Sequence, residues 1–331
     1  MSSYFGLIQL GLLASFGFAT LAALVSVVAY PLLRPVLISL IPAQRSNILL
    51  AWLLMPACVG LLFTLLSFTP SLLSILGITA DHCSVHDGHP QLCLIHLPPP
   101  ADGIFLPMFI ILSGAAALFF AGVYTLRLVR AYRFHRTLMM LSRECDARDI
   151  RIVEWDEPLA ISAGLYHMRV FVSEHVMRVL SPQQLDVVLA HERKHAQRKD
   201  ALRHLLAHLL SFAHIPWLRK RLLEDMDLAC EQSCDEAAVR STGDRLHVAD
   251  TIVFIERMFI QKQPAFMGLS ISGSNITQRV ESLLHTPTSE NASWLPYVTL
   301  AGIVFVLLIA AFSSVGELHH HTESILGFLT R

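Results

Sequence analysis

The sequence predicts an α-helical membrane protein with about four transmembrane helices and one cytoplasmic domain that mixes helices and strands. Composition is the first reason, because 53% of the 331 residues are apolar and only 15% are charged. A soluble chain of this length carries charge on about a quarter of its residues. Patterning is the second reason. The apolar residues gather in long uncharged blocks and leave most charged residues between residues 137 and 292.

Four uncharged blocks define the predicted membrane helices. They are residues 5–30, 48–68, 104–126 and 295–312. Each block approaches the roughly 20 apolar residues that a helix needs to cross a bilayer. Pro56 lies inside the second block and is expected to kink it. We therefore expect three membrane helices and an external loop (70–103) within residues 1–136, and a fourth membrane helix with a short tail within residues 293–331.

Basic residues predict the orientation, because cytoplasmic loops are enriched in Lys and Arg. The first basic residue, Arg34, follows the first block, so this block does not read as a signal peptide. The third block is followed by Arg127, Arg130, Arg133 and Arg136, whereas the 70–103 loop contains neither Lys nor Arg. We expect the N-terminus and the tail outside, and the 31–47 loop and the 137–292 domain inside.

Within that domain, a helix is predicted to begin near residue 181. Ser181 can cap it, Pro182 suits the first helical position, and Gln184 stands where the partner in a capping box would stand. Apolar residues then follow at helical spacing within residues 185–189. We expect this helix to run on through a series of leucines toward Pro216.

The predicted helix contains an H-E-x-x-H sequence, formed by His191, Glu192 and His195. Residues four apart share one face of a helix, so both histidines can bind the same metal ion. Glu192 lies beside them and can take a proton from a metal-bound water. This combination is typical of zinc hydrolases.

A third metal ligand is expected in the next acidic cluster. Glu231 and Asp235 are four residues apart and would share a helix face. Glu231 would complete the metal site, and Asp235 would hold the far nitrogen of one ligating histidine. Glu224 is the main rival as third ligand, and Cys230 and Cys234 are also alternatives, because cysteine binds zinc well.

Four stretches carry a family resemblance. They are residues 158–164 (PLAISAG), 170–173 (VFVS), 185–200 (LDVVLAHERKHAQRKD) and 231–237 (EQSCDEA). Together they resemble the regulatory membrane zinc metallopeptidases of the antibiotic-sensor (BlaR/MecR) type. The resemblance is close over residues 150–240 and looser over the apolar blocks.

That resemblance implies a zincin-like (gluzincin) metallopeptidase domain of α+β type on the cytoplasmic side of a bacterial inner membrane. His191, His195 and Glu231 match the metal ligands of the family, and Glu192 matches its catalytic base. Those sensors carry a large external drug-binding domain after the last membrane helix, whereas only the 19 residues 313–331 follow here. We therefore do not expect direct covalent sensing of a β-lactam.

Two short strands are predicted in the domain, at residues 150–153 and 168–172, with a turn at 161–164. In related zinc peptidases a strand such as 168–172 lines the cleft and pairs with an extended substrate. Physically, an exposed strand edge offers unpaired backbone groups to a peptide. An ordinary hairpin strand is the alternative.

A hydrolase of this kind also needs a donor that steadies the developing oxyanion. Tyr166, His247 and Arg279 are the candidates, and a surface salt bridge is the alternative role for Arg279.

The external loop is dense in residues that bind metals. These are His82, Cys83, His86, His89, Cys93 and His96. Imidazole and thiolate suit copper or zinc, so one hypothesis is a metal-sensing loop. The alternative is a disulfide between Cys83 and Cys93, because this loop would face an oxidising compartment.

We expect a membrane-embedded zinc endopeptidase with one Zn²⁺ per chain, which cleaves itself, a transcriptional repressor or both in response to a signal. Two alternatives are a non-catalytic zinc-containing receptor for metal or envelope stress, and a housekeeping quality-control protease. The expected partners are a protein or peptide substrate and membrane lipid. The arginines at 127–136 have a membrane-boundary explanation, so no direct nucleic-acid partner is expected.

Overall fold

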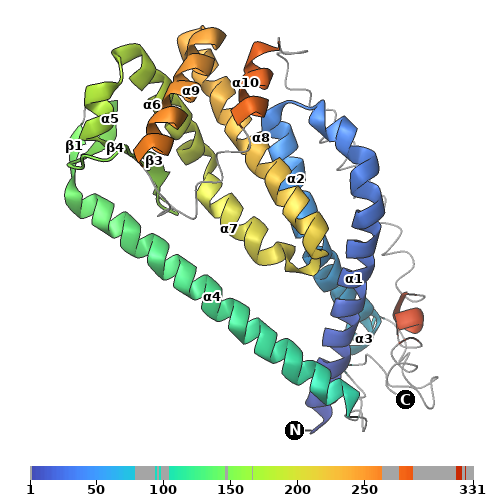
Figure 1. Cartoon of the computed structure of the whole chain (residues 1–331). Coiled ribbons are helices and arrows are strands. Elements are labelled where there is room, and N and C mark those ends of the chain that lie inside the picture. Colours follow the sequence, from blue (N-terminus) through green and yellow to red (C-terminus); the bar gives the residue numbers. More distant parts are fainter. Residues whose placement is uncertain are drawn as a thin grey trace.

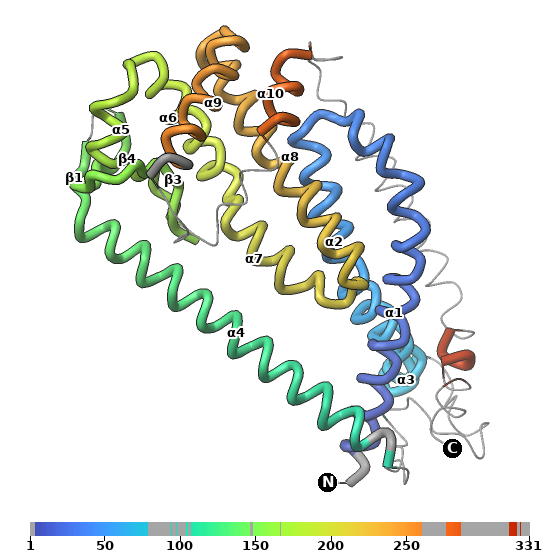
Figure 2. The backbone as a smooth tube through the Cα atoms, in the orientation of Figure 1, coloured from blue at the N-terminus to red at the C-terminus, as the bar shows by residue number. Residues whose placement is uncertain are grey.

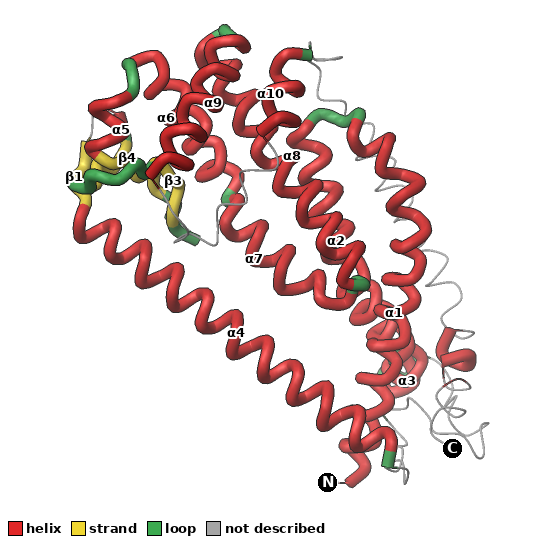
Figure 3. Tube along the Cα trace, viewed as in Figure 1, coloured by secondary structure: helices red, strands yellow, loops and turns green. Residues whose placement is uncertain are grey.

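The computed structural model describes residues 2–78, 94, 97, 104–145, 148–165, 167–262, 276–285, 318–322 and 325. In this part of the chain the structure is mostly helical, with one small sheet (Figure 1, Figure 3). The fourth apolar block, residues 295–312, lies outside the described residues. The histidines and cysteines of the 70–103 loop lie outside them as well, so those predictions stay untested.

Three helical segments are long and apolar enough to cross a membrane. They are α1 (Ser2–Ile38), α2 (Pro42–Ser67) with its continuation α3 (Thr69–Ile75), and α4 (Phe105–Leu141). Pro56 lies inside α2 without ending it. Many large apolar side chains on these helices are exposed, such as Leu118 on α4, and a continuous apolar surface of this kind suits lipid.

The three long helices are arranged unevenly. α1 and α2 pack along each other, whereas α4 meets α1 near one end, where the rings of Phe16 and Phe109 are 5.3 Å apart (Figure 1). From there α4 runs toward the small sheet, and its last residue is followed directly by the first strand.

The sheet has the strand order β1-β2-β4-β3. Its strands are β1 (Ser142–Cys145), β2 (Ile150–Val153), β3 (Ala160–Ala163) and β4 (Arg169–Ser173). β2 and β4 are parallel, and the other two pairs are antiparallel. The predicted strands at 150–153 and 168–172 are confirmed as β2 and β4.

One sequence expectation about this sheet is wrong. Residues 161–163 belong to strand β3, so the turn that was predicted at 161–164 begins only at Gly164. Gly164 has φ +127°, and a Cβ there would stand 2.4 Å from a backbone oxygen, so glycine marks the true turn position. Of the two alternatives for residues 168–172, the structure favours the ordinary hairpin strand, because β4 is paired on both sides and β3 is the edge strand.

Helices make up the rest of the domain. They are α5 (Glu174–Val179), α6 (Pro182–Arg198), α7 (Asp200–Leu210), the 3-10 turn η3 (Ser211–Ala213), α8 (Pro216–Thr242), α9 (Arg245–Lys262) and α10 (Ile276–Leu284).

The predicted start of α6 is confirmed. The Ser181 hydroxyl accepts from the backbone N–H of Gln184 at 3.2 Å, and the Gln184 side chain accepts from the Ser181 N–H at 3.0 Å. The expectation that this helix continues toward Pro216 is wrong. It ends at Arg198, because Lys199 takes a left-handed conformation (φ 54°) and α7 starts in a new direction.

α8 occupies the centre of the molecule, between the membrane helices and the rest of the domain (Figure 2). Leu222 and Met226 are fully buried in one apolar cluster with Leu49 and Leu53 of α2. Another face of α8 packs on α6, and a separate cluster joins the sheet to α6. The domain is therefore packed onto the α1–α2 hairpin through α8.

The connection between α7 and α8 reaches the middle of two long helices. The Tyr124 hydroxyl of α4 donates to the His208 carbonyl, and a ring nitrogen of His214 lies 3.0 Å from the Trp52 carbonyl of α2. Phe212 and Trp217 at this tip are mostly exposed. An apolar tip therefore lies beside the candidate membrane spans.

Candidate metal centre

Three potential ligands meet where α6 packs on α8. His191 and His195 come from α6, and Glu231 comes from α8. The two Nε2 atoms are 3.1 Å apart, and each is 3.5 Å from an oxygen of Glu231. The structure thus brings together the three residues that the sequence nominated.

The far nitrogens of both histidines contact carboxylates. His191 Nδ1 is 3.0 Å from Asp235, and His195 Nδ1 is 2.8 Å from Asp200. Asp235 lies where the sequence placed it. No role was predicted for Asp200. The signal for it was its place at the end of the 185–200 stretch that carries the family resemblance.

These contacts make the site suitable for a cation. Each Nδ1 donates its hydrogen to a carboxylate, so each Nε2 presents a lone pair toward the other. Two such lone pairs at 3.1 Å favour a cation between them, and in the metal-free protein a proton on His195 takes that place. Ligand atoms about 2.0–2.1 Å from a tetrahedral zinc lie about 3.3 Å from one another. The observed separations of 3.1 and 3.5 Å fit that geometry.

Arg279 of α10 braces the acidic side of the site. Its Nε and Nη2 donate to Asp235 at 2.8 and 2.7 Å, and its Nη1 lies 3.0 Å from Glu231. The side chain is buried, so the alternative of a surface salt bridge is wrong. All three nitrogens already have a carboxylate partner, so Arg279 would have to leave one of them to act as an oxyanion donor. That role stays a prediction.

The other two oxyanion candidates are not tested by the structure. Tyr166 lies outside the described residues. His247 lies in the first turn of α9, where its backbone N–H donates to Asp244 at 3.0 Å. In the described part of the chain, no contact joins His247 to the three potential ligands.

The rival ligands are placed less favourably, although Cys234 forms a second possible metal group with His195 and Asp200. Glu224 is half exposed and lies 3.9 Å from Lys220 and from Arg221. Cys234 stands behind His195, with its thiol 4.0 Å from Asp200, and burial raises the pKa of this thiol to about 11. Cys230 accepts a hydrogen bond from Arg198 at 3.6 Å. The structure therefore favours Glu231.

Electrostatics separates the two glutamates of the site. Burial raises the pKa of Glu192, the negative charge of Glu231 adds to this, and a backbone hydrogen bond from Ser162 on β3 opposes it. Burial alone would raise the pKa of Glu231 too, but hydrogen bonds with His191 and His195 and the charge of Arg279 hold it well below its usual range. Glu231 is therefore held in its anionic form, which suits a metal ligand, whereas the pKa of Glu192 is shifted in the direction that a general base requires.

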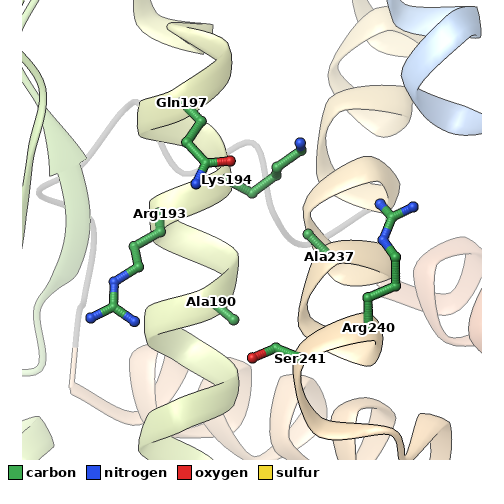
Figure 4. A pocket seen from close by; sticks show the side chains of 7 residues that line it. All are labelled: Ala190, Arg193, Lys194, Gln197, Ala237, Arg240 and Ser241. Carbon is green, nitrogen blue, oxygen red and sulfur yellow. The ribbon is translucent and has the colours of Figure 1, made fainter. Parts of the chain in front are cut away.

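A hollow elsewhere on α6 and α8 is separate from these ligands. It measures about 420 Å³ and is lined by Ala190, Arg193, Lys194, Gln197, Ala237, Arg240 and Ser241 (Figure 4). None of these is a potential metal ligand, and they lie on other faces of α6 and α8 than the ligands do. The catalytic chemistry is therefore not assigned to this hollow.

The helix pair, its three potential ligands and the adjacent Glu192 are the components that a metallopeptidase site requires. Residues 149–268 match the model of Peptidase family M48, a family of zinc-dependent metallopeptidases. The match includes all three potential ligands, Glu192, Asp200 and Asp235, whereas Arg279 lies beyond it. Neither the comparison with curated proteins nor the comparison with solved structures gave a match. The match supports the predicted class of enzyme, a metallopeptidase.

Proposed function

We propose that this chain is a membrane-embedded zinc endopeptidase in which His191, His195 and Glu231 hold one Zn²⁺ and Glu192 is the catalytic base. One observation carries the proposal. The two Nε2 atoms face each other at 3.1 Å and are each 3.5 Å from Glu231, while both far nitrogens contact carboxylates. A zinc ion between these atoms would satisfy all three ligand groups at once, with both rings held by their carboxylates.

When bound, zinc polarises the scissile carbonyl and lowers the pKa of the attacking water. Glu192 accepts a proton from that water and delivers it to the leaving amide nitrogen. Its raised pKa suits both steps, because a carboxylate with a pKa nearer neutrality takes up and returns a proton more readily. Asp200 and Asp235 keep the imidazole rings oriented, and Arg279 keeps Glu231 and Asp235 in place.

The substrate binds along β3 in this proposal. β3 is an edge strand of the described sheet, its residues are partly exposed, and the N–H of Ser162 bonds Glu192. An extended peptide that pairs with this edge passes beside the catalytic base. An open strand edge accepts the interior of a peptide as well as its ends, which is why we propose an endopeptidase.

The membrane location is supported by the three apolar helices and by the apolar tip between α7 and α8, with Phe212 and Trp217 at its surface. We propose that the tip enters the bilayer beside α2 and α4. The basic residues near 31–47 and 127–136 support an outside N-terminus and a cytoplasmic 137–292 domain in a bacterial inner membrane. Residues 293–331 would add a fourth span and an external tail.

The regulatory role follows the resemblance to BlaR/MecR-type sensors. In that role the enzyme cleaves itself, a repressor or both, and the His- and Cys-rich external loop is the candidate input. A housekeeping protease would share the site and differ in the breadth of its substrates. A non-catalytic receptor would keep the zinc and would not need the Glu192 carboxylate.

The test compares the protein termini in cells that produce the wild type, Glu192→Gln or Glu224→Gln, with and without added copper. Glu224→Gln removes the same charge from a half-exposed position on α8. We expect new protein termini with the wild type and with Glu224→Gln, and about 100-fold fewer or none with Glu192→Gln. The purified Glu192→Gln protein should still bind zinc. Identical termini in all three, with zinc bound, would favour the receptor. New termini in only a few proteins would indicate a regulatory protease, whereas new termini in many proteins would indicate a housekeeping protease.

A further inference from the structure

A second hollow lies at the end of the α1–α2 hairpin. It measures about 240 Å³ and is lined by residues of α1, α2, α8 and α10. The residues that line it are Tyr30, Arg34, Leu37, Ile38, Arg45, Leu49, Asp225, Leu228, Gln232 and Gln278. We call this hollow the hairpin pocket. It shares no residue with the metal centre.

The two arginines of the hairpin pocket are in different electrostatic positions. Arg34 is neutralised by Asp225, which accepts from its Nε at 2.6 Å and from its Nη2 at 3.0 Å. The Tyr30 hydroxyl donates to the same carboxylate. Asp225 therefore already serves as the counter-charge of one arginine.

Arg45 has no counter-charge of its own. Among the described residues, no carboxylate lies within 4.0 Å of its guanidinium. Its Nη1 donates to the Ile38 carbonyl at 3.2 Å and its Nη2 to the Gln232 side chain, which are both neutral acceptors. Its Nε is buried and has no partner in the described part of the chain, and the residue is only 7% exposed. A buried guanidinium in this state is unfavourable unless an anion joins it.

The surroundings of Arg45 indicate which anion fits. α2 begins at Pro42 without a side-chain cap, so the positive end of the helix dipole is on the same side as Arg45. Four of the lining residues are aliphatic: Leu37, Ile38, Leu49 and Leu228. The pocket therefore combines one unpaired cation with apolar walls, at the end of two candidate membrane spans.

We propose that the hairpin pocket binds the phosphate group of an anionic phospholipid, with Arg45 as its main contact. Basic pockets between membrane helices on the cytoplasmic side bind such headgroups. A volume of about 240 Å³ is below the roughly 300–1,000 Å³ of pockets for drug-sized ligands, so it suits a headgroup and not a whole lipid. A free phosphate ion has the same chemistry and is distinguished by the experiment.

The pocket is also connected to the metal centre. Gln232 accepts from Arg45 and donates to the Gln278 carbonyl at 3.1 Å, so it links α2, α8 and α10. Gln232 and Gln278 are the chain neighbours of Glu231 and Arg279. A phosphate on Arg45 therefore also stabilises the helices that carry two residues of the metal centre, although its binding does not require zinc.

The experiment uses the purified full-length protein in maltoside micelles. The micelles contain dioleoylphosphatidylglycerol, the same fraction of dioleoylphosphatidylcholine, or inorganic phosphate without lipid. Native mass spectrometry counts retained lipid, and thermal unfolding measures the stabilisation. Arg45→Gln is compared with Arg130→Gln, which removes the same charge from an exposed position on α4. We expect phosphatidylglycerol to bind at least about tenfold more weakly to Arg45→Gln and unchanged to Arg130→Gln.

A second variant covers the case in which Arg45→Gln fails to fold. Leu228→Phe keeps every charge and narrows the hairpin pocket, so it should lose the same lipid while it keeps the fold. Stabilisation by inorganic phosphate that vanishes in Arg45→Gln would support the site and identify a soluble anion as its ligand. Equal lipid binding by the wild type, Arg45→Gln and Leu228→Phe, or equal losses in Arg45→Gln and Arg130→Gln, would overturn the proposal.

Discussion

Asp200→Asn tests whether the residue that the sequence did not nominate controls the metal centre. Asp200 is 3% exposed and contacts His195 Nδ1 at 2.8 Å. It also accepts from Arg198 at 3.2 Å and lies 3.3 Å from Arg203. Asparagine has the same shape but no charge, and its NH₂ group can face the ring. The tautomer that leaves Nε2 free for the metal is then no longer enforced.

The expected loss can be worked out from these contacts. Substituting a partner that holds a metal-ligating histidine weakens metal affinity by about 10–100-fold, or about 1.4–2.7 kcal/mol. Asp200 holds one of the two histidines, so we expect Asp200→Asn to fall in this range and not to abolish binding. The two arginines also lose their counter-charge, so the metal-free protein should unfold at a lower temperature.

The assay is zinc affinity measured by competition with a chelator of known affinity, with thermal unfolding of the metal-free protein beside it. Asp186→Asn is the matched control, because Asp186 also pairs with an arginine, Arg148 at 3.1 Å, but its side chain is 61% exposed. A pair of that kind contributes about 0–1 kcal/mol. If Asp200→Asn binds zinc within twofold of the wild type while folded, the proposed orienting role of Asp200 is refuted.

Three further predictions concern the same region. Arg279→Gln leaves Glu231 and Asp235 buried without their cation, so we expect a loss of about 3–5 kcal/mol in the free energy of unfolding, measured by denaturant titration; a loss below 1 kcal/mol would contradict the bracing role. Burial lowers the pKa of His195, but hydrogen bonds with Asp200, Cys234 and Glu231 outweigh it and raise this pKa well above the usual value, so zinc must displace a proton at neutral pH. Zinc affinity measured at pH 6, 7 and 8 should therefore rise with pH, by up to about tenfold per unit, and an affinity that is flat over this range would exclude the protonated form. Gly164→Ala brings a Cβ to 2.4 Å from a carbonyl at φ +127°, so we expect a loss of about 1–3 kcal/mol and a lower melting temperature; an unchanged melting temperature would show that the β3–β4 turn adjusts freely.

Local patterns in the sequence were sufficient to predict several helices of this protein and two of the potential metal ligands. The start of α6 is encoded by neighbours, because Ser181 and Gln184 satisfy each other's backbone groups within one turn. The shared face of His191 and His195 follows from the helical repeat alone. The first three apolar blocks likewise predict long helices, because length and hydropathy are local quantities.

For the third metal ligand, the sequence suggested candidates but could not decide between them. Glu231 and Asp235 share a face of α8 by spacing, but their choice over Glu224 and the cysteines depends on how α8 rotates against α6. That rotation is determined by packing between helices, which spacing along one helix does not contain.

Tertiary structure alone decided the rest. The break at Lys199, which brings Asp200 back to His195, falls inside a series of leucines that continues at helical spacing. The edge position of β3 depends on β2 pairing with β4, whose partner residues are 20 positions apart in the chain. Arg279 reaches two carboxylates from a helix more than 40 residues further along the chain. The sequence by itself determined the helices and the chemistry they carry, because those depend on neighbours along the chain. Only the fold decided which residues hold that chemistry in place, because these contacts join distant segments.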